Sequence, residues 1–220
     1  MVRFLQAGDA ALVVEYGDAV DPELNGRVLA LYHQLARGVV PGVVELVPTY
    51  RSLLVEYDPL VTGYPELVEM LRPLTGVPPA PGAGRLLEVP VRYGGPAGPD
   101  LEEVAAHCGL TPGEVIRRHS APTYRVYMLG FSPGFPYLGG LDPSLHVPRL
   151  SQPRLRVPAG SVAIAGHQAG IYPQTTPGGW RIIGHTRLVP FNPVLDPPFL
   201  FQAGDLVRFV PVKENEDAGV

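Results

Sequence analysis

Short apolar runs alternate with polar positions over residues 4–74, and the pattern predicts two pairs of strands, each followed by a helix. Strands are expected at residues 4–6, 11–16, 43–47 and 52–57. Asp21 and Pro22 are typical of a helix start, and apolar residues at helical spacing follow them as far as Gly38. A second helix is expected to begin at Pro65. The order ββαββα implies an antiparallel sheet with helices on one face, an α+β domain.

The sequence TGVPPAPGAG, residues 75–84, interrupts every periodicity. We therefore predict a first domain over residues 1–78, a semi-rigid linker over 79–84 and a second domain over 85–214. Residues 215–220 are acidic and are expected to form a flexible tail.

The second domain is predicted to be mainly β. Its clearest strands are expected at residues 86–93, 123–129, 161–165, 180–183 and 206–212. Asp100 with Glu103, and Thr111 with Glu114, have the spacing of capping boxes and predict two short helices. Because long connections join the strands, a closed or nearly closed barrel is favoured over a flat sandwich.

Composition supports a folded chain and narrows the class of function. The sequence is 45% hydrophobic, and its 26 glycines and 27 prolines separate strand-length apolar runs, which indicates turn-rich β structure. The net charge is −4 with scattered basic residues, so a nucleic-acid partner is not expected. Gln6, Gly8 and Asp9 interrupt the first apolar run, and no membrane-spanning run follows, so we expect a cytosolic protein. The single Cys108 agrees with a reducing compartment.

Lysine is almost missing from the sequence. Of the 17 basic residues only Lys213 is a lysine, and it lies near the acidic carboxyl end. A phosphate-binding P-loop needs a lysine after its glycines, and imine chemistry needs one in a pocket. The chain is therefore expected to provide neither chemistry alone.

The segment GFSPG contains Ser132 in the spacing of a nucleophile elbow, but we reject that interpretation. The elbow uses the backbone N–H of the residue after the serine, and here that residue is Pro133, which has none. The histidines show no metal-ligand spacing, so no metal site is predicted. His167 and His185 differ from the others because each lies in a glycine-flanked turn, where binding sites often form.

Residues 122–192 are the strongest candidate for a ligand site. Glycines and prolines in this segment alternate with aromatic, arginine, glutamine and histidine side chains. Arg149, Arg154 and Arg156 could hold an anion, although stem packing and surface ion pairs are the alternative for each one. The aromatic residues could equally be ordinary core, but a pure core does not need glutamine and histidine between glycines.

Seven segments together resemble the KipI family, which includes the B subunit of the bacterial ATP-dependent 5-oxoprolinase, also called allophanate hydrolase subunit 1. The segments are DAALVVEYGD, VVELVPTYRSLLVEYDP, LEVPVRYGGPAGPDLEEVAAHCGL, GFSPGFPYLGGL, PRLRVPAGSVAIAG, GIYPQTTPGGWRIIGHT and GDLVRFVPV. The resemblance covers nearly the whole chain. It implies an N-terminal α+β domain and a C-terminal cyclophilin-like β-barrel of the carboxyltransferase type.

The resemblance also implies an activity and partners. The enzyme would open 5-oxo-L-proline to L-glutamate with ATP hydrolysis, together with a second barrel-type polypeptide, the C subunit, and a third, the A subunit. ATP, with Mg, is expected at the level of the complex and not on this chain alone. No catalytic residue is assigned. Two alternatives stay open: an inhibitor of a sensor histidine kinase, and a subunit related to the carboxyltransferase of urea carboxylase.

We predict that the substrate-binding residues surround a pocket of the barrel. They are Phe135, Tyr137, Arg154, Gln168, Tyr172, Trp180 and His185.

Overall fold

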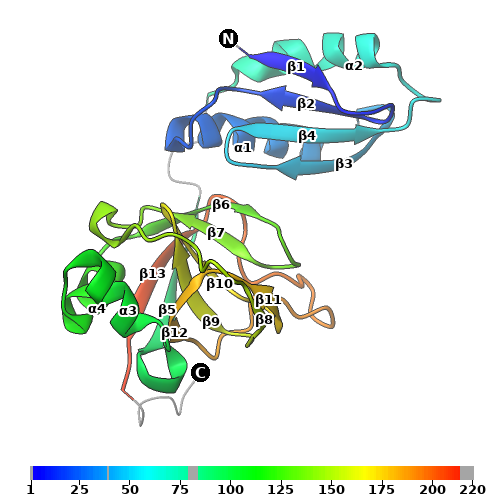
Figure 1. The fold of residues 1–220 in the computed structure, drawn as a ribbon. Coiled ribbons are helices and arrows are strands. Elements are labelled where there is room, and N and C mark those ends of the chain that lie inside the picture. The colour runs from blue at the N-terminus through cyan, green and yellow to red at the C-terminus, as the bar shows by residue number, and fades with distance from the viewer. Residues whose placement is uncertain (1, 39, 79–83, 214–220) are drawn as a thin grey trace. The chain divides into compact units, whose positions relative to one another are not determined.

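The computed structural model of the protein describes residues 2–38, 40–78 and 84–213. Contacts within the chain divide it into two compact units, Met1–Ala83 and Gly84–Val220 (Figure 1). Residues 79–83 of the predicted linker and the predicted tail, residues 215–220, lie outside the described residues. In the part of the chain that is described, no helix is both long enough and apolar enough to cross a membrane.

The first unit is a four-stranded antiparallel sheet with two α-helices. The sheet has the order β1-β2-β4-β3. In chain order the elements are β1 (Arg3–Gln6), β2 (Ala11–Glu15), α1 (Pro22–Arg37), β3 (Val43–Pro48), β4 (Ser52–Tyr57), α2 (Tyr64–Leu71) and a 3₁₀ turn (Arg72–Gly76).

One core holds this unit together. Alternate residues of β2 and β4, such as Leu12 and Leu53, are fully buried and pack with Leu31 of α1 and Leu67 of α2. The predicted start of α1 is confirmed, because the side chain of Asp21 accepts hydrogen bonds from the N–H groups of residues 23 and 24.

The second unit is a closed seven-stranded barrel, which confirms the barrel prediction. Its strand order is β10-β7-β6-β13-β5-β12-β9. The elements are β5 (Leu86–Tyr93), a 3₁₀ turn (Gly95–Ala97), α3 (Leu101–Cys108), α4 (Pro112–Ser120), β6 (Tyr124–Leu129), β7 (Pro136–Gly139), a 3₁₀ turn (Pro143–Leu145), β8 (Arg154–Val157), β9 (Ser161–Ala165), β10 (Gln168–Ile171), β11 (Thr176–Gly178), β12 (Arg181–His185) and β13 (Leu206–Pro211).

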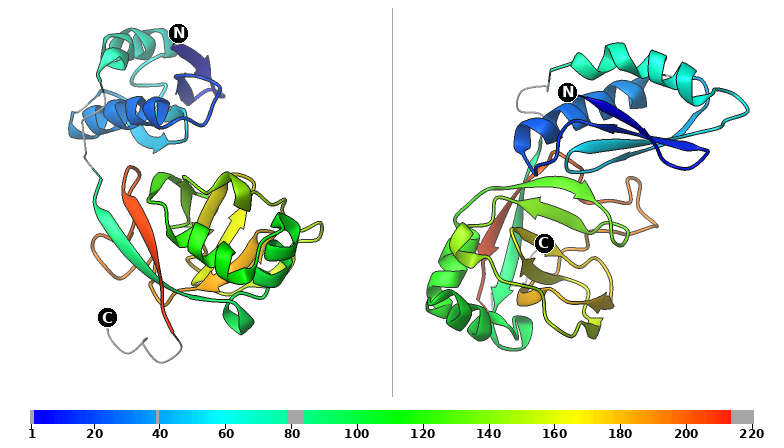
Figure 2. Two further views of the ribbon diagram at one scale, coloured as in Figure 1. Left: turned by 90° about the vertical axis from the view of Figure 1, so that its left-hand side faces the viewer. Right: turned by 45° about the horizontal axis from the view of Figure 1, so that its top comes forward.

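The barrel is closed by strands from both ends of the unit. β5 and β13 pair in parallel, while the other neighbours in the barrel pair antiparallel. β8 and β11 form a separate two-stranded sheet. In both views of Figure 2, helices α3 and α4 lie beside each other on the outside of the barrel.

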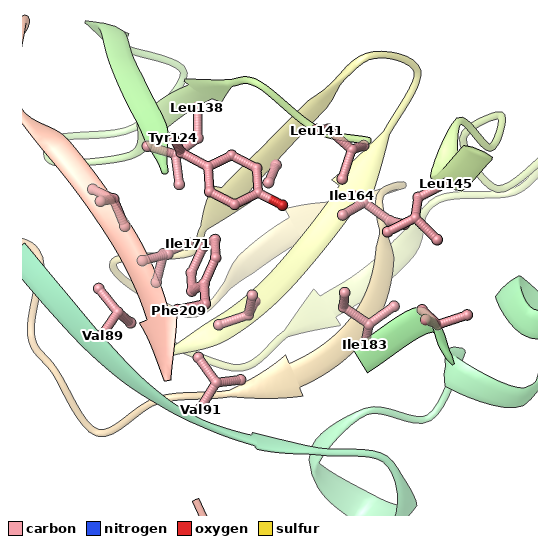
Figure 3. Close-up of a cluster of buried hydrophobic side chains, with 14 of the residues drawn as sticks. Val89, Val91, Tyr124, Leu138, Leu141, Leu145, Ile164, Ile171, Ile183 and Phe209 are labelled. Atoms are coloured by element: carbon pink, nitrogen blue, oxygen red, sulfur yellow. The ribbon is translucent and has the colours of Figure 1, made fainter. Parts of the chain in front are cut away.

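The inside of the barrel is filled by side chains. Tyr124, Phe209, Ile164 and Ile183 come from four different strands and are almost completely buried. Figure 3 shows them pointing toward one another from the surrounding strands. This packing is that of a solid small barrel and leaves the outer face of the wall for other side chains.

Candidate functional site

The wall of the barrel carries two layers of side chains because successive residues of a strand point to opposite faces. On β9, Val162 and Ile164 belong to the interior core, whereas Ala163 and Ala165 belong to a second cluster. The predicted aromatic site residues lie in that second cluster. The candidate site is therefore on the outer face of the barrel wall, not in the barrel interior.

Four of the predicted residues form what we call the aromatic cluster: Phe135, Tyr137, Tyr172 and Trp180. The ring of Phe135 lies at its centre, with ring centroids 5.0 Å from Tyr137, 5.2 Å from Tyr172 and 5.4 Å from Trp180. Each pair meets edge to face, the favourable arrangement for aromatic rings. The sequence prediction thus grouped residues from three separate segments that do pack on one another.

Two glycines make room for these rings. A Cβ atom on Gly170 would lie 2.6 Å from Cζ of Phe135, and one on Gly178 would lie 2.3 Å from the hydroxyl oxygen of Tyr172. Neither position tolerates a larger residue without moving the aromatic cluster. This requirement explains part of the glycine content of the segment.

The cluster continues to the surface through Phe131. The Phe131 ring is 61% exposed and contacts Phe135 and Tyr172, with centroids 5.5 and 6.3 Å away. Among the described residues it is the one non-glycine with positive φ, at 66°. An exposed aromatic residue in a strained backbone conformation is typical of a site where the side chain is needed in place.

Ser132 is not arranged as an enzyme nucleophile. Its N–H donates to the carbonyl of Gly130 over 2.7 Å, and its hydroxyl is buried without a hydrogen-bond partner among the described residues. The geometry agrees with the rejection of the elbow on the ground of Pro133.

Arg149 supplies a positive charge at the surface of the cluster. Its guanidinium carbon lies 5.9 Å from the centre of the Trp180 ring, within cation–π range. Burial raises the pKa of Tyr137 and of Tyr172, and the nearby Arg149 charge acts in the opposite direction on both. The two phenols therefore stay protonated near neutral pH. We call Phe131, Tyr137 and Arg149 the rim, because they are exposed or half-buried while Phe135, Tyr172 and Trp180 are buried.

Arg154, another of the predicted site residues, makes an ion pair inside the barrel unit. Its guanidinium makes two hydrogen bonds to the carboxylate of Asp100, at 3.0 and 2.6 Å. Asp100 is buried and also accepts a 2.7 Å hydrogen bond from the N–H of Ile182. Arg154 thus links β8 to β12 and to the start of α3, and its charge is already matched.

The same contacts correct the prediction of a capping box at Asp100. The Asp100 side chain makes no hydrogen bond to the first turn of α3, because its oxygens are used by Arg154 and Ile182. At Thr111 the capping box is confirmed, with reciprocal hydrogen bonds between Thr111 and Glu114.

The other predicted site residues lie at strand ends. His185 ends β12, and its Nε2 atom is 2.9 Å from the carbonyl oxygen of Ala159. Gln168 begins β10, is half-buried and pairs with Gly139 and Ala165. Neither residue belongs to the aromatic cluster.

His167 pairs with His146, since their Nδ1 atoms are 2.9 Å apart. No group of three or more His, Cys, Asp or Glu side chains within residues 2–38, 40–78 and 84–213 is arranged to hold a metal ion.

A comparison with protein-family models gives a match over residues 2–201 to the model described as carboxyltransferase domain, subdomain C and D. The chain belongs to this family. The match spans both units and includes the whole aromatic cluster and rim.

Relatives in the carboxyltransferase C and D family include proteins described as the B subunit of 5-oxoprolinase. The one from Bacillus subtilis (strain 168) is 43% identical and aligns over 96% of this chain and 93% of its own length. The one from Escherichia coli O157:H7 is 45% identical over 94% of this chain and 95% of its own length.

Among solved structures, TTHA0988 is similar with a TM-score of 0.83 and 42% identity, covering 97% of this chain. The present chain spans about two fifths of that protein, 40% of its length. In this carboxyltransferase C and D domain, the rim places the Arg149 cation beside an aromatic cluster that reaches the surface.

Proposed function

We propose that this chain is the B subunit of a cytosolic, multi-subunit ATP-dependent 5-oxoprolinase, which converts 5-oxo-L-proline to L-glutamate. The observation that carries the proposal is the sequence identity of 43 to 45% with two proteins described as the B subunit of 5-oxoprolinase. Each alignment covers more than nine tenths of this chain and of the relative. The barrel, of the cyclophilin-like type in this proposal, would contribute one wall of the substrate site.

The chemistry explains why ATP is needed. The lactam of 5-oxoproline is a resonance-stabilised amide and a poor electrophile. Transfer of a phosphoryl group from ATP to its carbonyl oxygen makes the ring carbon open to attack by water, and the C–N bond then breaks to leave an amine and an acyl phosphate. A second water hydrolyses the acyl phosphate to the carboxylate of glutamate and free phosphate. No residue of this chain is assigned to that step.

Partner subunits follow from the description of the relatives as subunits. We propose that the partners are a second barrel-type polypeptide, the C subunit, and a third polypeptide, the A subunit. ATP and Mg²⁺ would be bound at the level of the complex, since the only lysine, Lys213, is not placed in a phosphate-binding loop.

Reconstitution tests the proposal. The purified chain is mixed with the two partner subunits, and ADP release and glutamate formation are followed with and without 5-oxoproline. We expect both products only when all three subunits and 5-oxoproline are present. Turnover by the chain alone, or equal turnover when the chain is omitted, would refute the assignment.

The family description favours one second candidate, a carboxyltransferase subunit. In that case the complex would transfer a carboxyl group from carboxybiotin to a small amide such as urea. The same mixture supplied with a carboxylated biotin carrier and urea separates the two, because the 5-oxoprolinase assignment expects no carboxyl transfer.

A further inference from the structure

Arg149 differs from Arg154 and Arg181 because its charge is unmatched. Arg154 is paired with Asp100 and Arg181 with Glu103, each with an N–O distance of 2.6 Å. Within residues 2–38, 40–78 and 84–213, Arg149 makes no ion pair with a carboxylate. It is also exposed, so a carboxylate from solution has access to it.

Hydrogen bonds connect the backbone on either side of Arg149 to the segment that carries Trp180. The N–H of Leu150 donates to the carbonyl of Gly179 over 2.7 Å. Nε of Arg181 donates to the carbonyl of Pro148 over 3.3 Å. The backbone at Arg149 is therefore fixed next to Trp180 from both sides, so binding does not have to order this segment of the chain.

The surroundings of Arg149 suit a small, flat, singly charged molecule. A guanidinium group binds a carboxylate through two parallel hydrogen bonds. The half-buried Tyr137, whose ring centroid lies 6.0 Å from that of the buried Trp180, offers aromatic surface for a ring. No carboxylate among the described residues competes for the position.

We propose that Arg149 binds the carboxylate of the substrate at the rim and so selects for ring compounds that carry this group. The inference rests on the proposed function in that 5-oxoproline combines one carboxylate with a flat five-membered lactam. Arg149 acts here in binding and specificity and takes no part in breaking the lactam bond.

The kinetic test uses the complete complex rebuilt with Arg149→Ala. We expect KM for 5-oxoproline to rise about tenfold or more, because a charge-assisted bidentate contact is lost, while kcat changes much less. Arg149→Lys keeps the positive charge but cannot make two parallel hydrogen bonds, so its KM should lie between those of the wild type and Arg149→Ala. Arg117→Ala, which removes an exposed arginine on α4, is the matched control and should leave KM unchanged. An unchanged KM in Arg149→Ala would overturn the proposal.

A binding test on the chain alone separates this inference from the proposed function. Trp180 is the only tryptophan of the sequence, so its fluorescence reports on this position alone. The probes are 5-oxoproline, cyclopentanecarboxylate and 2-pyrrolidinone, the last a lactam without a carboxylate. We expect a saturable change of fluorescence with the two carboxylates and none with 2-pyrrolidinone. In Arg149→Ala the affinity for the carboxylates should be about tenfold weaker or more.

The two proposals fail in different ways. If the complex does not turn over 5-oxoproline but Trp180 responds to carboxylates through Arg149, the carboxylate site stands and the substrate assignment falls. If the complex is active, its KM decides the role of Arg149. If the complex is inactive and Trp180 shows no saturable response, or the same response in Arg149→Ala, the carboxylate site is refuted.

Discussion

At the scale of single residues, Asp100 is a buried carboxylate that connects three segments of the barrel unit. Its buried carboxylate accepts two hydrogen bonds from Arg154 and one from the N–H of Ile182. Replacement by alanine leaves a guanidinium and a buried N–H without partners. We expect Asp100→Ala to lower the free energy of unfolding by about 2 to 4 kcal/mol in urea denaturation followed by Trp180 fluorescence.

A matched control is available in the same unit. Glu88 pairs with Arg208, and both side chains are about half exposed. Because water screens such a pair, Glu88→Ala should lower the free energy of unfolding by about 1 kcal/mol or less. Equal losses in the two variants would show that the buried Asp100 contacts contribute no more than a surface ion pair.

His119 makes the stability of the barrel depend on pH. Its ring is fully buried, lies 2.7 Å from the Tyr93 hydroxyl through Nδ1 and stacks on Phe209. Burial lowers the pKa of His119 from 6.5 to about 3. Between these values the unfolded state binds a proton that the folded state does not, so His119 reduces stability increasingly as the pH falls from 6.5 toward 3.

The corresponding prediction compares the wild type with His119→Asn, which does not titrate. Urea denaturation is measured between about pH 7 and pH 4. As the pH falls over this range, the free energy of unfolding of the wild type should decrease by up to about 1.4 kcal/mol per pH unit more than that of the variant. Parallel pH dependences of the two proteins would contradict a neutral buried His119.

At the scale of elements, β10 makes room for the aromatic cluster because it has a glycine, Gly170, next to the Phe135 ring. A methyl group on Gly170 would meet the ring of Phe135 at 2.6 Å and the carbonyl oxygen of Pro136 at 3.2 Å. We expect Gly170→Ala to lower the free energy of unfolding by about 1 to 3 kcal/mol and to shift the Trp180 emission spectrum. Thermal unfolding and fluorescence measure the two effects.

Gly113 provides the control for this substitution. It lies in α4, and a Cβ atom there would meet nothing within 4 Å. Gly113→Ala should be neutral or stabilise by up to about 1 kcal/mol, because alanine restricts the unfolded chain and favours the helix. Destabilisation by both substitutions to the same extent would remove the packing argument for Gly170.

The elements that could be predicted from the sequence are those with local signals. Thr111 and Glu114 are three residues apart in the chain, so the start of α4 could be predicted. The strand Leu86–Tyr93 has a long apolar pattern and was predicted with both of its boundaries. β10 was missed because Gln168–Ile171 is short and contains glycine. Its position depends on pairing with β7 and β9.

The candidate site was predictable in composition but not in arrangement. The aromatic residues could be picked out because they occur among glycines, and four of them do form one cluster. The pairing of Arg154 with Asp100, 54 residues away, and the lack of such a partner for Arg149 among the described residues depend on tertiary contacts. For this reason the sequence pointed to Arg154, whereas the unmatched charge of the rim is on Arg149.

At the scale of the whole molecule, each unit has its own hydrophobic core. One core is made only of residues from Met1–Ala83, and the cores of the barrel unit contain only residues from Gly84–Val220. We therefore expect a fragment of residues 84–220 to fold alone and to unfold in one cooperative step with Trp180 fluorescence close to that of the full chain. A fragment without a cooperative transition would contradict the independence of the barrel core.

The assignment of this polypeptide as an essential part of a 5-oxoprolinase can be tested by titration. The rate of 5-oxoproline-dependent ADP release is measured at fixed amounts of the partner subunits, with increasing amounts of this chain. We expect a rate near zero without the chain that rises and levels off at a defined ratio of subunits. A rate that does not respond to the chain at any ratio would contradict the assignment.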